Sequence, residues 1–236
     1  MMTSPLRVTV VMAVKNAAAY LAEALDSIAA QTRAPHEVIL VDGGSTDDTR
    51  AIAARYADVR VIQESAHGYA SAWNDGIRAS TGDAIALLDS DDRWAPEKLK
   101  WQTDALAADP DADCVIGHIT FFAEPGRPLP PSFRPDLLGR PHVGRMPGAL
   151  LARRRVFDTI GLFEADWEVA NDVDWFARLK DHGARVVILP QVLLEKRVHD
   201  RNLSYLSART SIINTEIIRA LRRSIHRQRQ TPDARS

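Results

Sequence analysis

The sequence predicts an α/β fold in which a mostly parallel central sheet is flanked by helices, and two observations support this prediction. Apolar, β-branched runs alternate with segments whose apolar residues recur every three or four positions, which is typical of strand–helix–strand units. Because ligands of such sheets bind beyond the carboxyl ends of the strands, polar clusters at those ends predict one shared site. Three runs end in such clusters, namely Lys15-Asn16, Asp42 and Asp89-Ser90-Asp91-Asp92.

The first half of the chain supplies four of the expected strands. They fall at residues 8–14, 37–41, 59–63 and 84–88, each an apolar run bounded by turn-forming or charged residues. Helices are expected between them at 19–31, 47–56 and 69–79, and the second follows a glycine turn at 43–44. This order predicts βαβ units and therefore parallel neighbours in the sheet.

The second half is less regular. A helix is expected over 96–108 and a strand over 114–122, and order resumes over 149–160. Residues 123–147 hold seven of the chain's 13 prolines, so we expect a long loop of the kind that forms lids and binding sites. Strands are predicted at 186–189 and 192–198. A helix is predicted over 173–180, with an apolar side formed by Val173, Phe176, Ala177 and Leu179.

The chain closes with a predicted amphipathic helix over 205–229, followed by a frayed tail. Its arginines gather in the last turns, where the helix dipole favours positive charge. A peripheral contact at the inner membrane face and a homodimer interface are alternative roles for its apolar side. That side comprises Ile212, Ile213, Ile217, Leu221 and Ile225.

The composition excludes several classes of protein. The 236 residues are 45% hydrophobic and carry a net charge of -1, which fits one globular domain and gives no reason to expect a nucleic-acid partner. The single cysteine, Cys114, excludes a disulfide within the chain. No segment approaches the length that spans a bilayer, so we expect a cytoplasmic protein.

Six motifs together resemble the family-2 glycosyltransferases, which have the GT-A fold. In chain order they lie at residues 10–16, 39–47, 88–92, 161–163, 171–175 and 197–199. The resemblance implies one domain over residues 1–204, with a nucleotide-sugar-binding half at 1–92 and an acceptor-binding and catalytic-base half at 93–204. Residues 205–236 then form an Arg-rich helix and tail. Two departures concern the donor site, because Ala13-Val14-Lys15 replaces a Pro-x-Tyr segment and Trp73 replaces a common arginine.

The resemblance also implies roles for individual residues. Asp91 becomes a ligand of Mn²⁺ or Mg²⁺, Asp89 a contact to the donor ribose and phosphates, and His199 the group that completes the metal site. Asp42 accepts a hydrogen bond from the donor base, which suits the uracil N3–H of a UDP-sugar or the N–H edge of guanine. A GDP- or dTDP-sugar therefore stays open as the donor. The other residues expected at the donor are Ala13, Lys15, Asn16, Trp73, Asn74 and Ser90.

The implied reaction is an inverting transfer of a sugar to an acceptor hydroxyl. A divalent metal neutralises the charge that grows on the leaving diphosphate, and Asp172 is the general base that removes the hydroxyl proton. The family opens the helix that carries this base with Glu-Asp, whereas this chain has Asn171-Asp172. The acceptor stays open among saccharides, lipid-linked sugars, peptides and small molecules.

Three other functions are alternatives for this sequence. A nicotinamide-dependent enzyme is disfavoured because no Gly-x-Gly-x-x-Gly follows the first strand. A sugar-phosphate nucleotidyltransferase of related fold usually carries a Gly-rich, Arg-containing loop there, and this chain does not. A catalytically impaired nucleotide-sugar-binding homologue stays open because Asn171 departs from the acidic pair.

Overall fold

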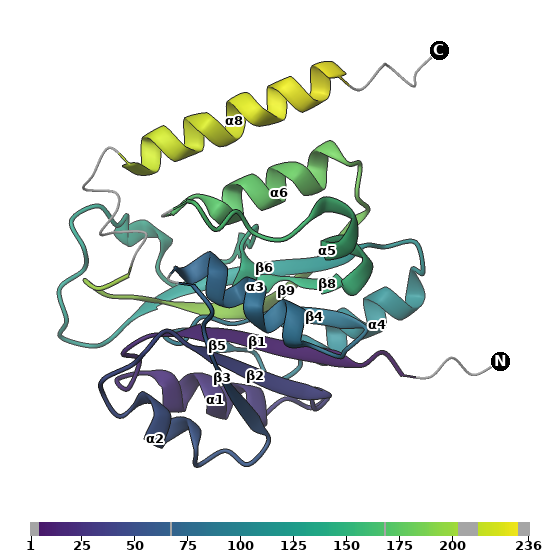
Figure 1. The fold of residues 1–236 in the computed structure, drawn as a ribbon. Coiled ribbons are helices and arrows are strands. Elements are labelled where there is room, and N and C mark those ends of the chain that lie inside the picture. The colour runs from purple at the N-terminus through teal and green to yellow at the C-terminus, as the bar shows by residue number, and fades with distance from the viewer. Residues whose placement is uncertain (1–4, 67, 168, 203–211, 231–236) are drawn as a thin grey trace.

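A nine-stranded sheet organises the molecule (Figure 1). The computed structural model describes residues 5–66, 68–167, 169–202 and 212–230. The sheet runs in the order β3-β2-β1-β4-β8-β6-β9-β5, and β7 pairs with β6. The strands are β1 (Val8–Val14), β2 (Glu37–Asp42), β3 (Val59–Gln63), β4 (Ala84–Leu87), β5 (Arg93–Trp94), β6 (Cys114–Ala123), β7 (His142–Val143), β8 (Leu151–Arg153) and β9 (Val186–Val198).

The predicted mostly parallel α/β sheet is confirmed. Strands β1, β2, β3 and β4 pair in parallel, and β6 pairs in parallel with β9. The short strands β5, β7 and β8 each pair antiparallel to their neighbours. The chain runs outward from β1 to β3 and then returns to place β4 on the other side of β1. This reversal creates the crevice in which α/β sheets bind their ligands.

Helices cover both faces of the sheet because residues along the central strands alternate between two apolar cores. Val10 and Met12 of β1 pack on one face with α1 and α4, while Val11 and Ala13 pack on the other with α3, α5 and α6. The α-helices are α1 (Leu21–Ala29), α2 (Thr49–Ala53), α3 (Tyr69–Ala79), α4 (Lys98–Ala108), α5 (Arg154–Ile160), α6 (Asn171–Asp181) and α8 (Ile212–Gln230).

Two sequence predictions for the second half need correction. The strands predicted at 186–189 and 192–198 form one continuous strand, β9. The register of β9 against β6 shifts beside Pro190, since Ile116 pairs with Ile188 but His118 pairs with Val192. A bulge accommodates proline because the ladder there needs no N–H donor. The two-residue strand β5, which pairs with β9, was not predicted, and it lies just before the helix expected from residue 96.

Residues 124–141, between β6 and β7, contain one short 3₁₀ helix, η1 (Pro135–Leu137), so the long loop predicted from the prolines is confirmed. A second 3₁₀ helix, η2 (Pro147–Ala149), leads into β8. The loop is anchored where Gly144 donates its N–H to the Gly117 carbonyl at 2.8 Å. A Cβ on Gly144 would lie 2.4 Å from Ile119 Cγ2, so only glycine permits this approach.

The C-terminal helix α8 lies along α6, on the side away from the sheet (Figure 1). Asp181 of α6 accepts hydrogen bonds from Ser224 and Arg227 of α8, each at 2.8 Å. The predicted apolar side is only partly used, because Ile217 packs inward whereas Leu221 and Ile225 are exposed. Residues 205–211 of the predicted helix, the predicted boundary at 204 and the tail at 231–236 lie outside the described residues.

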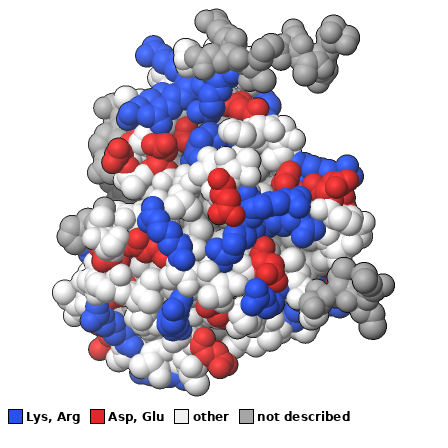
Figure 2. Space-filling view, turned by 45° about the vertical axis from the view of Figure 1, so that its right-hand side comes forward, with Lys and Arg blue, Asp and Glu red and all other residues white. Residues whose placement is uncertain are grey.

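Charge is mixed over the surface, as the net charge suggests. Figure 2 shows acidic and basic side chains interspersed over one face, with Lys and Arg gathered at the top of the view over α8. Among the helices described, none is both long enough and apolar enough to cross a membrane.

Candidate functional site

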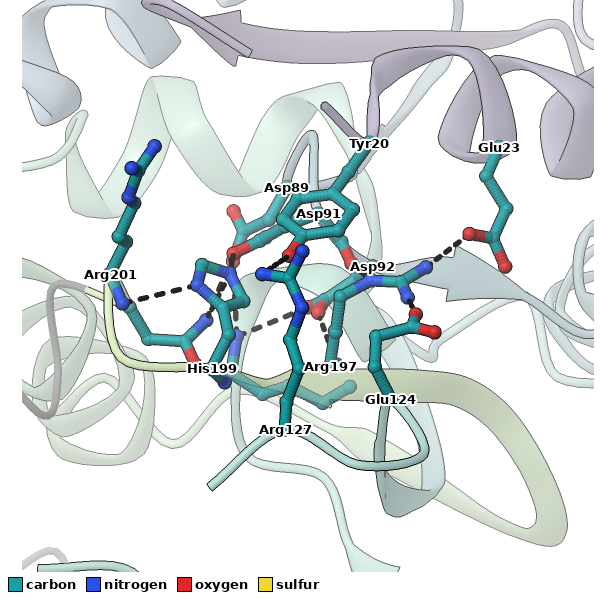
Figure 3. Close-up of polar contacts among 12 residues, drawn as sticks. Tyr20, Glu23, Asp89, Asp91, Asp92, Glu124, Arg127, Arg197, His199 and Arg201 are labelled. Carbon is teal, nitrogen blue, oxygen red and sulfur yellow. Dashed lines mark hydrogen bonds and ion pairs between the residues drawn. The ribbon is translucent and has the colours of Figure 1, made fainter. Parts of the chain in front are cut away.

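The acidic turn after β4 lies at the carboxyl end of the sheet, beside the reversal between β1 and β4 (Figure 3). Ligand oxygens of Asp89, Asp91 and Asp92 lie within 4.8 Å of one another. Three carboxylates at this spacing repel one another strongly unless cations or hydrogen-bond donors compensate them. The groups that surround the turn supply this compensation, and most of them come from β9 and the residues after it.

Asp92 is buried and binds two residues of β9. Its carboxylate accepts the Arg197 N–H at 2.8 Å and lies 3.1 Å from the Lys196 Nζ. Burial raises the pKa of Asp92 to about 7, although the Lys196 ammonium acts in the opposite direction. Burial works to lower the pKa of Lys196, but the charges of Asp92, Asp89 and Asp91 outweigh it and hold that pKa high.

Asp89 is held by two groups that the sequence did not single out. The Tyr69 hydroxyl, at the start of α3, donates to one carboxylate oxygen, and the Lys196 Nζ lies 3.4 Å from the other. Burial and the Asp89 charge together raise the pKa of Tyr69 well above its ordinary value, so it stays a proton donor. Asp89 is thus fixed in orientation while remaining partly exposed.

Asp91 and His199, assigned to one metal site from the sequence, are in direct contact. The His199 Nε2 and the Asn202 Nδ2 each lie 2.9 Å from Asp91 Oδ2. Burial acts to raise the pKa of Asp91, but the hydrogen bond to His199 and the Lys196 charge hold it below 3.8. Asn202 also accepts the His199 N–H at 2.7 Å, so one amide orients both groups.

Arg197 lies at the centre of a second set of contacts, on the far side of the turn (Figure 3). Its guanidinium donates to the Asp91 carbonyl at 2.9 Å and pairs with Glu23 of α1 and Glu124 of the long loop. The rings of Tyr20 and Phe122 each lie 4.5 Å from it. This buried cation therefore joins α1, the acidic turn and the start of the long loop.

Asp172 approaches the same site from the first turn of α6. Its carboxylate accepts the Val173 N–H at 2.8 Å. Burial raises the pKa of Asp172, the Asp89 charge raises it further, and Lys196 opposes them, which places its carboxylate within the field of the acidic turn. The Asn171 side chain is buried and accepts the Asp172 N–H at 3.1 Å, so the residue in the place of the family's glutamate is bound to the neighbouring backbone.

The segment before Asp172 is held by α8. Glu216 Oε2 accepts the Val169 and Ala170 N–H groups at 2.9 and 3.1 Å, which satisfies amides at the start of α6. Trp167 is buried, and the guanidinium groups of Arg219 and Arg223 lie over its ring, 5.3 and 5.1 Å from the ring centroid. The C-terminal helix thus fixes the approach to Asp172.

The residues expected at the donor base lie at the ends of β1 and β2. Asp42 is fully buried, with Arg50 Nε at 2.5 Å and the Ser45 N–H at 3.1 Å. Burial acts to raise its pKa, but the Ser45 and Arg50 hydrogen bonds lower it, so the carboxylate is ionised. Asn16, with φ of 51°, accepts the Thr46 N–H at 2.8 Å and thereby joins the two loops. Lys15 extends from the same edge and is exposed.

Other predicted donor residues lie deeper in the fold. Trp73 is buried and packs between Tyr69 and Phe163. The Asn74 amide exchanges two hydrogen bonds with the backbone of Phe163, at 2.8 and 3.0 Å. Ala13 is buried in β1, and Ser90 is half-buried in the acidic turn. Trp73 and Asn74 therefore hold the 161–163 segment against α3, and their role toward a donor stays a prediction.

The oxygen and nitrogen atoms at the acidic turn suit a divalent cation. Asp91 offers carboxylate oxygens and His199 an imidazole nitrogen, and Asp89 adds a third, partly exposed group. Asp92 is fully engaged by Lys196 and Arg197, so it contributes charge to the site rather than a ligand atom.

The fold and the acidic turn define a glycosyltransferase domain of the GT-A type. The chain belongs to glycosyl transferase family 2, whose family model matches residues 9–177. An uncharacterized glycosyltransferase of Rickettsia typhi is 32% identical over 214 residues, which cover 84% of this chain and 65% of the relative. An uncharacterized protein of Mycobacterium bovis is 30% identical, over 78% of this chain and 56% of its own. The chain thus spans only about two thirds or less of these relatives.

Solved structures share the fold. S. aureus TarS residues 1–349 in complex with UDP-GlcNAc superimpose with a TM-score of 0.73, at 22% identity, over 96% of this chain and 68% of that one. The mannosyltransferase PcManGT from Pyrobaculum calidifontis, in complex with GDP-Man and Mn²⁺, gives a TM-score of 0.67 at 24% identity, over 93% and 65%. The GT-A fold implied by the sequence motifs is therefore confirmed.

Replacing Lys196 tests the compensation at the acidic turn. Lys196→Met leaves the buried Asp92 carboxylate without its cation, so we expect the free energy of unfolding at pH 8 to fall by about 3 kcal/mol. Asp92→Asn in the same chain should recover at least ~1 kcal/mol of that loss, because the uncompensated charge is then gone. Urea denaturation of the two single variants and the double variant measures the coupling, and strictly additive losses would contradict it.

Proposed function

We propose that the protein is an inverting glycosyltransferase that moves a sugar from a nucleoside-diphosphate sugar to an acceptor hydroxyl. One observation carries the proposal: the charge of Asp89 acts on the buried Asp172 carboxylate, and Asp91 of the same acidic turn contacts His199, which supports a base close to a diphosphate site. Neither half alone defines a transferase. Together they support a proton acceptor close to the anomeric carbon of a bound donor.

The donor half is the acidic turn with His199. Asp91 and His199 would hold Mn²⁺ or Mg²⁺, which when bound neutralises charge on the leaving diphosphate. Asn202 orients Asp91 and His199, and Lys196 compensates the charge of the turn before the donor binds. Asp89 is oriented by Tyr69 to accept hydrogen bonds from the donor ribose.

The base half is Asp172. The acceptor oxygen attacks the anomeric carbon while its proton passes to the Asp172 carboxylate, and the bond between that carbon and the diphosphate oxygen breaks. One displacement of this kind inverts the configuration at the anomeric carbon. Burial raises the pKa of Asp172 toward the working pH, which strengthens it as a base. Glu216 accepts hydrogen bonds from the backbone of residues 169 and 170, and these bonds keep the Asp172 carboxylate in place.

A UDP-sugar is the favoured donor. Asp42 stays ionised and can only accept hydrogen bonds, which suits uracil N3–H once Arg50 moves aside. TarS and PcManGT were solved with UDP-GlcNAc and GDP-Man respectively, and these complexes support a nucleoside-diphosphate sugar as the class of donor. GDP- and dTDP-sugars belong in the same screen.

Two substitutions separate the donor half from the base half. Asp91→Ala should reduce Mn²⁺-dependent binding of UDP by at least about tenfold, because the metal loses a charged ligand. Asp172→Asn should bind UDP as the unchanged protein does and lose transfer. Calorimetry with UDP and Mn²⁺ measures the first effect, and hydrolysis or transfer from a panel of nucleotide sugars measures the second.

Asp104→Asn is the matched control, because Asp104 is exposed on α4 and pairs with Lys100. If Asp172→Asn lost UDP affinity as severely as Asp91→Ala, the assignment of Asp172 as the base would be wrong. If the unchanged protein bound donors but cleaved none with any metal, it would be a binding homologue.

The pH dependence of transfer reports on Asp172. The base must be ionised to accept a proton, and the pKa of Asp172 is raised above the ordinary 3.8 of an aspartate. We therefore expect kcat/KM to fall as the pH drops through this raised pKa. The acid limb of the profile, measured with the best donor of the screen, should shift in Asp172→Glu. An acid limb that keeps its midpoint in Asp172→Glu would assign the titration to another group.

A further inference from the structure

A cavity of about 200 Å³ lies beside α6, away from the acidic turn. Its floor is apolar, formed by Ile116 and Val186 of the sheet and by Phe176 and Leu179 of α6. Arg145 and Lys180 stand at its rim, and no acidic side chain lines it. An apolar floor with cations at its edge suits a ligand that carries both apolar surface and negative charge.

Both cations are available to a ligand. Arg145 and Lys180 are exposed, and among the residues described neither forms an ion pair with a carboxylate. Arg197 at the candidate active site, by contrast, is paired with Glu23 and Glu124. Two cations without counter-charges around one cavity create a local positive potential that favours an anion.

The cavity lies in line with Asp172. Residues 172, 176 and 180 are four apart, so they form one row along α6. Asp172 is the first residue of that row and Lys180 the last. Phe176 and Lys180 both line the cavity. Eight residues of α-helix span about 12 Å. A molecule whose hydroxyl meets Asp172 could therefore extend along α6 into the cavity.

The backbone next to Arg145 is held firmly at the rim of the cavity. Its neighbour Gly144 is pinned to the Gly117 carbonyl at 2.8 Å, with no room for a side chain. Arg145 belongs to the long loop at residues 123–147, within the half expected to bind the acceptor, and this loop starts at the Arg197–Glu124 pair. One loop thus connects the acidic turn to the cavity.

We propose that the cavity is an acceptor subsite that binds a phosphate or similar anionic group, about 12 Å from the hydroxyl that reacts. Arg145 and Lys180 bind the anion, and the apolar floor packs against the carbon chain next to it. This inference rests on the proposed function, since it takes Asp172 as the base. The anion could belong to a lipid-linked phosphate or to a phosphate ester of a water-soluble acceptor.

Two phosphate esters test the subsite directly. Octyl phosphate, used below its micellar concentration, and ethyl phosphate are titrated into the full chain by calorimetry or heteronuclear NMR, with octyl glucoside as the uncharged comparison. We expect octyl phosphate to bind more tightly than octyl glucoside. Arg145→Gln and Lys180→Gln should each weaken phosphate-ester binding by about tenfold, the scale of one lost charge-assisted hydrogen bond.

The control variant is Arg55→Gln, which removes an exposed arginine at the end of α2 and should leave phosphate-ester binding unchanged. If octyl phosphate binds more tightly than ethyl phosphate and both depend on Arg145, the subsite is supported and its anion belongs to a lipid-linked phosphate. If the two esters bind equally and depend on Arg145, the subsite is supported and its anion belongs to a water-soluble acceptor. Equal binding of octyl phosphate and octyl glucoside, or insensitivity to both substitutions, overturns the proposal.

Failure of the subsite and failure of the proposed function give different results. UDP binding with Mn²⁺, measured on the same samples, reports the donor half and does not depend on the cavity. If UDP binds but the phosphate esters do not, only the subsite is wrong. If UDP fails to bind with any divalent metal, the proposed function is wrong whatever the esters do.

Discussion

The close approach of three carboxylates at the end of β4 is the constraint on which the rest of the site depends. Asp89, Asp91 and Asp92 lie within 4.8 Å of one another, which is unfavourable unless positive charge and N–H donors are near. Strand β9 supplies both through Lys196 and the Arg197 N–H. The pairing of β5 with β9 brings Lys196 to the turn although the two are more than a hundred residues apart in sequence.

This arrangement links structure to function through one segment. Residues 196–202 carry the cation that compensates the turn, the arginine that fixes its backbone and His199, which contacts Asp91. The opposite side of the site is organised similarly, since α8 fixes the segment that leads into Asp172. The acidic turn and the segment before Asp172 are thus each held by residues from the last fifth of the chain.

Much of the fold could be predicted from the sequence, because β1 to β4 are apolar runs whose pattern is local. The contacts of Lys196, Tyr69 and Asn202 could not, because they join residues far apart or of ordinary type. The predicted apolar side of α6 was partly wrong for the same reason: Val173 is exposed, whereas Asp174 is buried. Asp174 is paired with Arg178 at 2.7 Å and approached by Arg227 of α8, a tertiary contact that overrides the apolar pattern.

The most direct test of the account is anomalous diffraction from crystals grown with UDP and Mn²⁺. We expect one manganese peak at the acidic turn, within about 2.5 Å of an Asp91 oxygen and a His199 nitrogen, with the diphosphate bound to the same ion. The direct Asp91–His199 hydrogen bond would then be replaced by metal coordination. Diphosphate density at the turn without a manganese peak, or a peak that contacts neither residue, would contradict the account.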